Sequence, residues 1–203
     1  GCVPHLIGRG LMLHGNEVFA VWPPSPDELY GPRKVLAFRD HYFDRGMPLR
    51  KVQSLGMVSN PAIIANFLYD AMRKAGLGFG NAGRVPARIA GEIGQKLFEG
   101  AELFWGAMQD LPYDDNRVST LVDNEGVERI VITCHRRPEY IARVERFRSL
   151  IREAFAPLKV RFTAVPGEMN FGHPMGTCRM GEDEEHSVVD AKGRVWNQDG
   201  LYI

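Results

Sequence analysis

The stretch RVSTLVDNEGVERIVITC, residues 117–134, contains the clearest local signal of secondary structure in the sequence. Two runs rich in β-branched residues, 117–122 and 127–134, flank the tetrapeptide DNEG at 123–126. Aspartate at the first position and glycine at the fourth position of such a tetrapeptide are typical of a type I turn. The stretch therefore predicts a β-hairpin.

Apolar residues at helical spacing predict three helices around this hairpin. They cover residues 61–75, 86–99 and 138–156, and each begins at a proline, a residue favoured in the first turn of a helix. In the third helix we expect the charged residues to form a solvated face. These residues are Arg143, Arg146, Arg148, Arg152 and Glu153.

Short apolar runs predict further strands along the rest of the chain. They cover residues 18–22, 35–38, 52–58, 101–109, 160–165, 187–189, 194–196 and 201–203. Strands and helices do not alternate strictly, and long segments lead into and out of the helices. The sequence therefore predicts an α+β fold, with an antiparallel or mixed sheet and helices packed on one face.

Composition limits the classes of partner. The chain has 203 residues, of which 44% are apolar, enough for one sizeable core. Lys+Arg and Asp+Glu are 25 each, so no overall field favours nucleic acid. No apolar run approaches the roughly 20 residues that span a bilayer. Three widely spaced cysteines argue against a disulfide framework and favour a reducing compartment such as the cytoplasm.

Two common types of cofactor site, a dinucleotide site and a metal site, are not predicted. GFGNAG at 78–83 fits the spacing G-x-G-x-x-G, but it follows a predicted helix rather than a strand, so we interpret it as a turn. The histidines and cysteines do not fall into C-x-x-C, H-x-x-x-H or comparable pairs, so no metal site is predicted. Those considered are Cys134, His135, His173, Cys178 and His186.

The stretch HPMGTCRMG, residues 173–181, has features of a functional loop. A histidine side chain can accept and return a proton near neutral pH, as a general base does. Pro174 restricts the backbone after His173, and Gly176 allows close approach of main chain to a ligand. A histidine that is merely hydrogen-bonded in a loop is the alternative, and residue types alone leave it open.

This stretch and several others resemble, in residue identity and in order along the chain, segments of the glucose-methanol-choline (GMC) oxidoreductases. Residues 173–181 and the three stretches that follow are similar to the family's C-terminal region. Of two earlier stretches, the first is similar to the segment in which the family's chain leaves the flavin domain. The second is similar to another segment of the family. The five further stretches are SVVD 187–190, RVW 194–196, GLYI 200–203, GRGLMLH 8–14 and LPYDDNRV 111–118.

The resemblance implies an FAD-dependent enzyme that oxidises a CH–OH group by hydride transfer to flavin. In this family an antiparallel sheet in the substrate domain covers the pocket over the flavin. Residues 1–16 would lead out of the flavin domain, residues 17–170 would form the substrate-binding domain, and residues 171–203 would begin the C-terminal catalytic and flavin-contacting segment. An intact Rossmann-type FAD domain is not expected within these residues.

The resemblance also implies roles for individual residues. His173 would be the catalytic base or hydrogen-bonding partner of the substrate hydroxyl group. Removal of that proton lowers the barrier to hydride transfer, because it limits the positive charge that grows on the carbon. The expected flavin contacts are Pro174, Met175, Gly176 and Thr177, and the expected lining of the substrate pocket is Asn170 and Phe171.

The ends of the chain lead to a further expectation. The sequence starts without methionine and stops inside an apolar run, so we expect it to continue on both sides, with a second catalytic residue beyond Ile203. Without the family's glycine-rich flavin motif, the 203 residues alone are expected to be inactive. The substrate would be an alcohol, sugar or sugar acid, with an unknown electron acceptor. The alternative is a stand-alone, non-catalytic module that binds a ligand or a protein.

Overall fold

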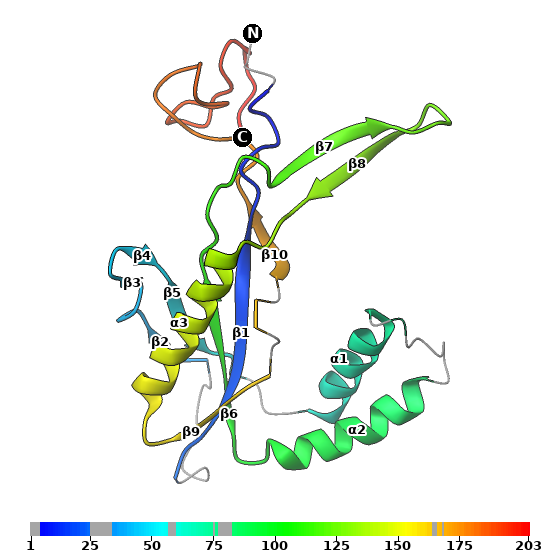
Figure 1. Ribbon diagram of the computed structural model, residues 1–203, viewed down its shortest axis with the longest axis vertical. Helices are drawn as coiled ribbons and strands as arrows, with labels where there is room; N and C mark the ends of the chain where they lie inside the picture. The colour runs from blue at the N-terminus through cyan, green and yellow to red at the C-terminus, as the bar shows by residue number, and fades with distance from the viewer. Residues whose placement is uncertain are drawn as a thin grey trace.

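The computed structural model describes residues 5–24, 34–56, 60–74, 76, 83–163, 166–167 and 169–203. Its centre is a six-stranded sheet in which all paired strands run antiparallel, built around one long strand, β1 (Figure 1). The strand order is β10 (Met169–Met175), β1 (Met12–Trp22), β6 (Glu102–Met108), β5 (Arg50–Ser54) and β2 (Ala37–Phe38), and β9 (Lys159–Phe162) also pairs with β1. The predicted α+β class with an antiparallel sheet is therefore confirmed.

The predicted hairpin is present and extends away from the sheet (Figure 1). Its strands are β7 (Arg117–Val122) and β8 (Glu128–Thr133), paired antiparallel along their whole length. The Asp123 carboxylate accepts hydrogen bonds from the backbone N–H groups of Glu125 and Val127, and Gly126 has a φ of 78°. The aspartate and the glycine thus stabilise the turn as their positions predict.

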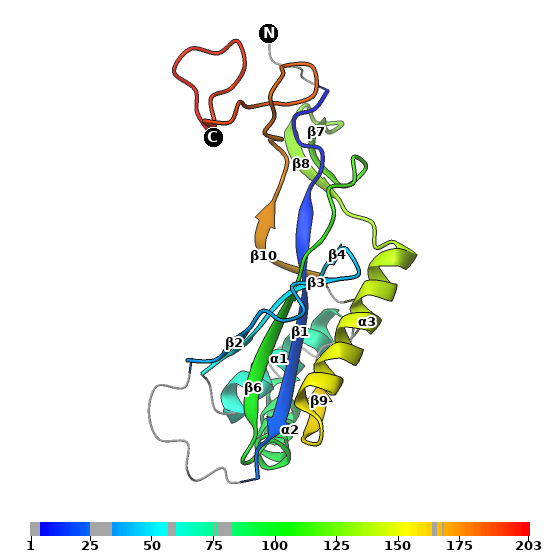
Figure 2. The same cartoon turned by 90° about the vertical axis from the view of Figure 1, so that its left-hand side faces the viewer.

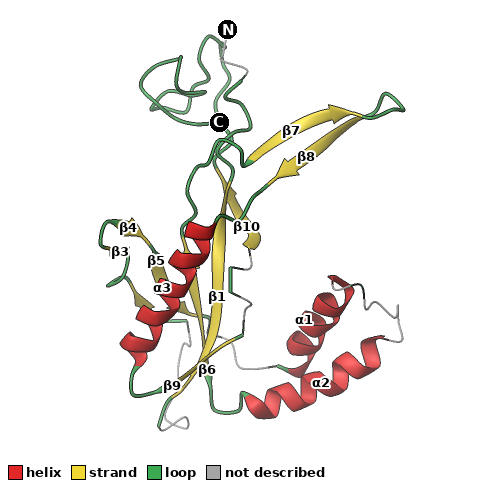
Figure 3. Ribbon diagram, in the orientation of Figure 1, coloured by secondary structure: helices red, strands yellow, loops and turns green. Residues whose placement is uncertain are grey.

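Three helices form within about two residues of their predicted bounds. They are α1 (Pro61–Lys74), α2 (Arg84–Leu97) and α3 (Pro138–Phe155). Helices α1 and α2 pack against each other as a hairpin beside the sheet, and α3 lies along the sheet (Figures 2 and 3). Gly91 permits the close α1–α2 contact, because a Cβ atom there would lie 2.4 Å from the carbonyl oxygen of Pro61.

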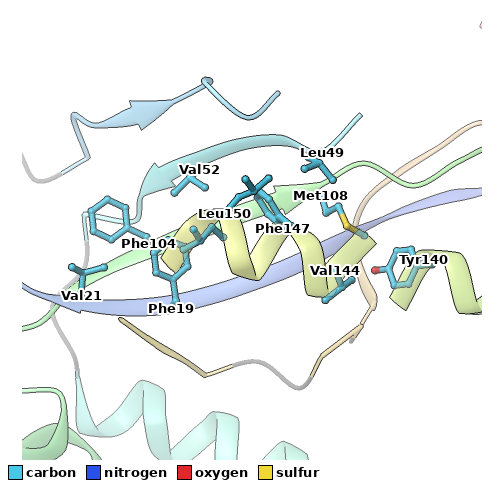
Figure 4. Close-up of a cluster of buried hydrophobic side chains, with 11 residues drawn as sticks. Phe19, Val21, Leu49, Val52, Phe104, Met108, Tyr140, Val144, Phe147 and Leu150 are labelled. Atoms are coloured by element: carbon cyan, nitrogen blue, oxygen red, sulfur yellow. The ribbon is translucent and has the colours of Figure 1, made fainter. Parts of the chain in front are cut away.

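The main core lies between α3 and one face of the sheet (Figure 4). Phe19 and Phe104 face each other across β1 and β6, with ring centroids 5.5 Å apart, and α3 covers them. The helix contributes Tyr140, Val144, Phe147, Leu150 and Ile151 to this core. Side chains alternate along a strand, so the same strands direct His14, Asn16 and Trp105 to the opposite face.

Several strands differ from their predicted bounds. β1 begins at Met12 rather than at residue 18, and β10 was not predicted. The small ladder of β3 (Phe43–Asp44) and β4 (Met47–Pro48) lies in a segment with no predicted strand. The predicted strands at 187–189, 194–196 and 201–203 form isolated bridges instead. Parts of two others, 57–58 and 164–165, lie outside the described residues.

The prediction of a solvated charged face on α3 is wrong for two arginines. Arg143 and Arg148 are only 5% and 6% exposed. Arg148 Nε donates to the fully buried carboxylate of Glu17 on β1 at 2.6 Å, and Arg143 Nη1 donates to the backbone oxygen of Gln109 at 2.7 Å. The carboxylate of Asp110, whose pKa is raised by burial, lies 3.8 Å from Arg143. The helix is thus fixed to the sheet by buried charges.

The C-terminal segment packs around a small second core. Val188, Val189 and Val195 are buried and contact Leu6 and Cys178. The start and the end of the described chain therefore lie close together (Figure 1). Within the described part of the chain, no helix has the length and apolar composition needed to cross a membrane.

We predict that Arg148→Met destabilises the fold by about 3–5 kcal/mol, because it leaves the Glu17 carboxylate buried without its cation. The matched change Arg152→Met, at an exposed position of the same helix, should cost less than about 1 kcal/mol. Urea unfolding of the variants measures both. A second change, Glu17→Gln, should restore part of the stability lost in Arg148→Met; equal losses in the two arginine variants would contradict a structural role for this pair.

Candidate functional site

Three of the family-like stretches meet through backbone hydrogen bonds. The N–H group of Gly8 donates to the oxygen of Thr177 at 2.7 Å, and the N–H group of Thr177 donates to the oxygen of Arg9 at 3.1 Å. The N–H group of Val118 donates in turn to the oxygen of Gly8 at 2.9 Å. We call this group of hydrogen bonds the backbone clamp. It brings residues that lie more than 160 positions apart in the sequence into one place.

Two glycines make the clamp sterically possible. Gly8 and Gly176 have φ values of 83° and 90°, in the left-handed region that favours glycine. A Cβ atom on Gly176 would lie 2.0 Å from the oxygen of Gly10, and one on Gly8 would lie 2.0 Å from the oxygen of Val118. The glycines of both stretches are therefore required by close backbone packing.

A bulge in β10 positions His173. Met12 of β1 pairs with Met175, and His14 pairs with Asn170, so two steps along β1 oppose five steps along β10. His173 lies within this bulge and has a φ of 61°, a left-handed conformation that costs a non-glycine residue roughly 1–3 kcal/mol. Bulges of this kind redirect a side chain and recur beside active sites. The backbone conformation thus fits a functional histidine.

The imidazole of His173 is exposed and is bordered by two aromatic rings. The ring of His14 lies 6.0 Å away at an interplanar angle of 78°, and the indole of Trp105 lies 6.1 Å away at 69°. The Trp105 Nε1–H donates a hydrogen bond to the side-chain oxygen of Asn16. We call His14, Asn16, Trp105 and His173 the aromatic site. It lies on the sheet face opposite α3.

The other predicted site residues lie close to His173 along the chain. Pro174 and Gly176 are exposed, and Met175 and Thr177 are half-buried. Thr177 is part of the backbone clamp. The backbones of Asn170 and Phe171 belong to β10, but their side chains lie outside the described residues.

The two rejected cofactor patterns can be followed only in part. Residues 78–82 of the G-x-G-x-x-G spacing lie outside the described residues. Among the residues that the structure does describe, no group of three or more histidine, cysteine, aspartate and glutamate side chains is placed to hold a metal ion. Asp183 lies in the acidic stretch at residues 182–185. Its carboxylate accepts hydrogen bonds from the N–H groups of Glu185 and His186, and its hydrogen bond with the His186 ring lowers its pKa.

Sequence reasoning missed three members of the aromatic site, His14, Asn16 and Trp105. The first two occupy the part of β1 that was not predicted as a strand. For a strand that begins at Met12, the alternation of side chains places both of them on the sheet face that Phe19 does not occupy. Trp105 was recognised only as part of an apolar strand, where an aromatic residue is ordinary.

Comparison with known families agrees with this arrangement. Residues 112–203 match the sequence profile of the family described as GMC oxidoreductase. This part of the chain is similar to the GMC oxidoreductases. The matched residues include the β7–β8 hairpin, α3 and β10. They therefore contain Val118 and Thr177 of the backbone clamp, and His173. The resemblance that the sequence motifs indicate is thus confirmed for this part of the chain.

Two curated relatives match almost the whole chain. The 6'''-hydroxyparomomycin C oxidase of Streptomyces lividus is 28% identical over 98% of this chain, and the paromamine 6'-oxidase of Streptomyces fradiae is 26% identical over 98%. The chain covers 33% and 34% of their lengths, or about a third of each. Both relatives are oxidases by name, which supports an oxidoreductase as the parent of this chain.

We predict that Gly176→Ala disrupts the clamp and destabilises the protein by more than Gly126→Ala. Both changes place a side chain at positive φ, at a cost of roughly 1–2 kcal/mol, but only position 176 adds a clash with the backbone. Position 126 is a matched control, because a Cβ atom added there would meet no other atom within 4 Å. Urea unfolding compares the two variants; equal losses would show that the Gly176–Gly10 contact is not tight.

Proposed function

We propose that the chain is the substrate-binding part of an FAD-dependent oxidoreductase that oxidises a CH–OH group of a sugar or a related alcohol, with His173 as the base. The observation that carries this proposal is the exposed imidazole of His173, held in a β10 bulge beside the sheet face opposite α3. It lies in the segment that matches the GMC oxidoreductases.

We also propose a division of roles along the chain. Residues 1–16 lead in from the flavin-binding part, residues 17–170 bind the substrate, and residues 171–203 begin the catalytic and flavin-contacting segment. β1 crosses the first boundary and β10 crosses the second. Because these two strands are paired, the roles are divided along the sequence but meet at one place in the fold.

The chemistry of His173 follows from its surroundings. A neutral imidazole nitrogen can accept the proton of a substrate hydroxyl group, and the remaining alkoxide character on oxygen helps hydride leave the adjacent carbon. The exposed ring leaves room for a substrate, and the rings of His14 and Trp105 lie beside it. Proton transfer of this kind typically contributes about 10²- to 10⁴-fold in rate.

The open side of β10 fits one wall of a flavin site. His173, Pro174 and Gly176 are exposed there. When bound, FAD supplies the hydride acceptor. We propose that the protein contacts to the flavin come from Pro174, Met175, Gly176 and Thr177.

The names of the relatives suggest the substrate class. The name of one of them states that it oxidises paromamine at the 6' position, and that of the other names a hydroxyparomomycin. We therefore propose a sugar hydroxyl group as the site of oxidation in this protein. Asn170 and Phe171 are proposed to line the pocket, because Asn170 pairs with His14 and so lies beside the aromatic site.

We predict that His173→Ala or His173→Gln, in the complete enzyme that contains this chain, slows reduction of the bound flavin by about 10²- to 10⁴-fold. FAD should remain bound, because the change removes the base and not the backbone around it. Anaerobic stopped-flow absorbance measures the reduction, and the visible spectrum reports bound FAD. Unchanged reduction kinetics would remove His173 from the mechanism.

The 203-residue chain alone is predicted to purify without flavin and without turnover. Its one G-x-G-x-x-G spacing follows a helix rather than a strand, which is the wrong context for binding a dinucleotide. The visible absorbance of the purified chain tests this. A yellow protein with stoichiometric FAD would contradict it, whereas sugar binding with neither flavin nor redox activity in any longer form would support a non-catalytic module.

A further inference from the structure

Trp105 occupies a central position on the sheet face opposite α3. It lies on β6, paired with Val18 of β1 on one side and with Gln53 of β5 on the other. Its side chain is half-buried, and its ring centroid is 6.1 Å from that of His173. A large aromatic side chain therefore lies next to the proposed base.

A hydrogen bond fixes the orientation of this indole. Its Nε1–H donates to the side-chain oxygen of Asn16, two residues along β1 from His14 and on the same face. The polar edge of the ring is thus already satisfied by the protein, and the face of an indole is suited to apolar or cationic contact. Asn16 acts on the position of Trp105, and not directly on a substrate.

The neighbouring polar side chains are suited to a hydroxylated ligand. Gln53 is directly opposite Trp105, and Lys51 is opposite Ala107, so both lie on the same sheet face as Asn16. Directly opposed side chains on a sheet lie about 5 Å apart at their Cβ atoms. An aromatic surface bordered by an amide and an ammonium group matches a sugar, which has an apolar C–H face and a rim of hydroxyl groups.

We propose that Trp105 is the platform on which a sugar ring of the substrate stacks, and that Asn16 positions this platform. The inference rests on the proposed function, and it adds to it a specificity-determining residue and a positioning residue. A sugar ring stacked on the indole extends its exocyclic hydroxymethyl group toward the imidazole of His173. An amino sugar gains further, because its ammonium groups are attracted to the indole face.

The test uses the complete, flavin-loaded enzyme with two probes, paromamine and 1-propanol. Equilibrium dialysis gives the Kd of paromamine, and stopped-flow flavin reduction compares the two probes. Trp105→Leu should raise the Kd of paromamine about tenfold and lower its reduction efficiency relative to that of 1-propanol, which has no ring to stack. Trp105→Phe, which keeps an aromatic face, should have a smaller effect.

Trp22 supplies a matched control on the same sheet. Its indole stacks on Phe98 at 6.0 Å and donates to the oxygen of Glu99, at the opposite end of β1 from His14. Trp22→Leu should leave the Kd of paromamine unchanged. Asn16→Ala should raise this Kd by less than Trp105→Leu does. Asn16→Asp, which keeps the acceptor oxygen, should have a Kd close to that of the unsubstituted enzyme.

Several outcomes would overturn the proposal. One is an unchanged Kd of paromamine in Trp105→Leu, another is an equal loss for both probes, and a third is the absence of paromamine binding to the unsubstituted enzyme. The proposed base is judged separately, from the reduction rate of His173→Gln. A raised Kd in Trp105→Leu with normal reduction in His173→Gln would support the platform and reject the base.

Discussion

The pairing of β1 on both of its edges is the constraint on which the rest of the structure depends. β6 pairs with one edge, and β9 and β10 pair with the other, so four strands share one register. A shift of one residue in this register would exchange the two faces of the strand. Phe19 would then leave the core, and His14 and Asn16 would point at α3.

Buried charges reinforce that register. Glu17 faces α3 and is held by Arg148, while the Asp110 carboxylate accepts a hydrogen bond from the N–H group of Leu13, immediately before His14. In any other alignment of helix and strand the two charges would be buried apart from each other, which is strongly destabilising. These contacts therefore connect the packing of α3 on one face with the position of the aromatic site on the other.

The predictable parts of this protein are those determined by neighbours in the sequence. The three helices and the β7–β8 hairpin depend on local periodicity, prolines and the turn at Asp123, and they appear as predicted. The beginning of β1 does not, because His14, Gly15 and Asn16 have weak β preferences and become a strand only through pairing. β10 contains Pro174 and a left-handed residue, which no strand pattern includes.

The site follows the same division. His173 could be identified from a motif, but its partners lie on strands that approach it only in the folded chain. Arg143 and Arg148 were misjudged for a similar reason, since the acidic groups that they contact belong to distant segments. Helical periodicity shows that side chains share a face; it does not show what that face meets.

The β7–β8 ribbon has a consequence for how the protein behaves at high concentration. Within the described chain the two strands form a sheet of their own, and they carry apolar side chains that reach 74% exposure at Ile130. Leu121, Val122 and Ile132 are exposed beside it. Open strand edges with apolar faces are templates for intermolecular pairing. We therefore expect this ribbon to favour association of the isolated chain, and charged substitutions along it to oppose that association.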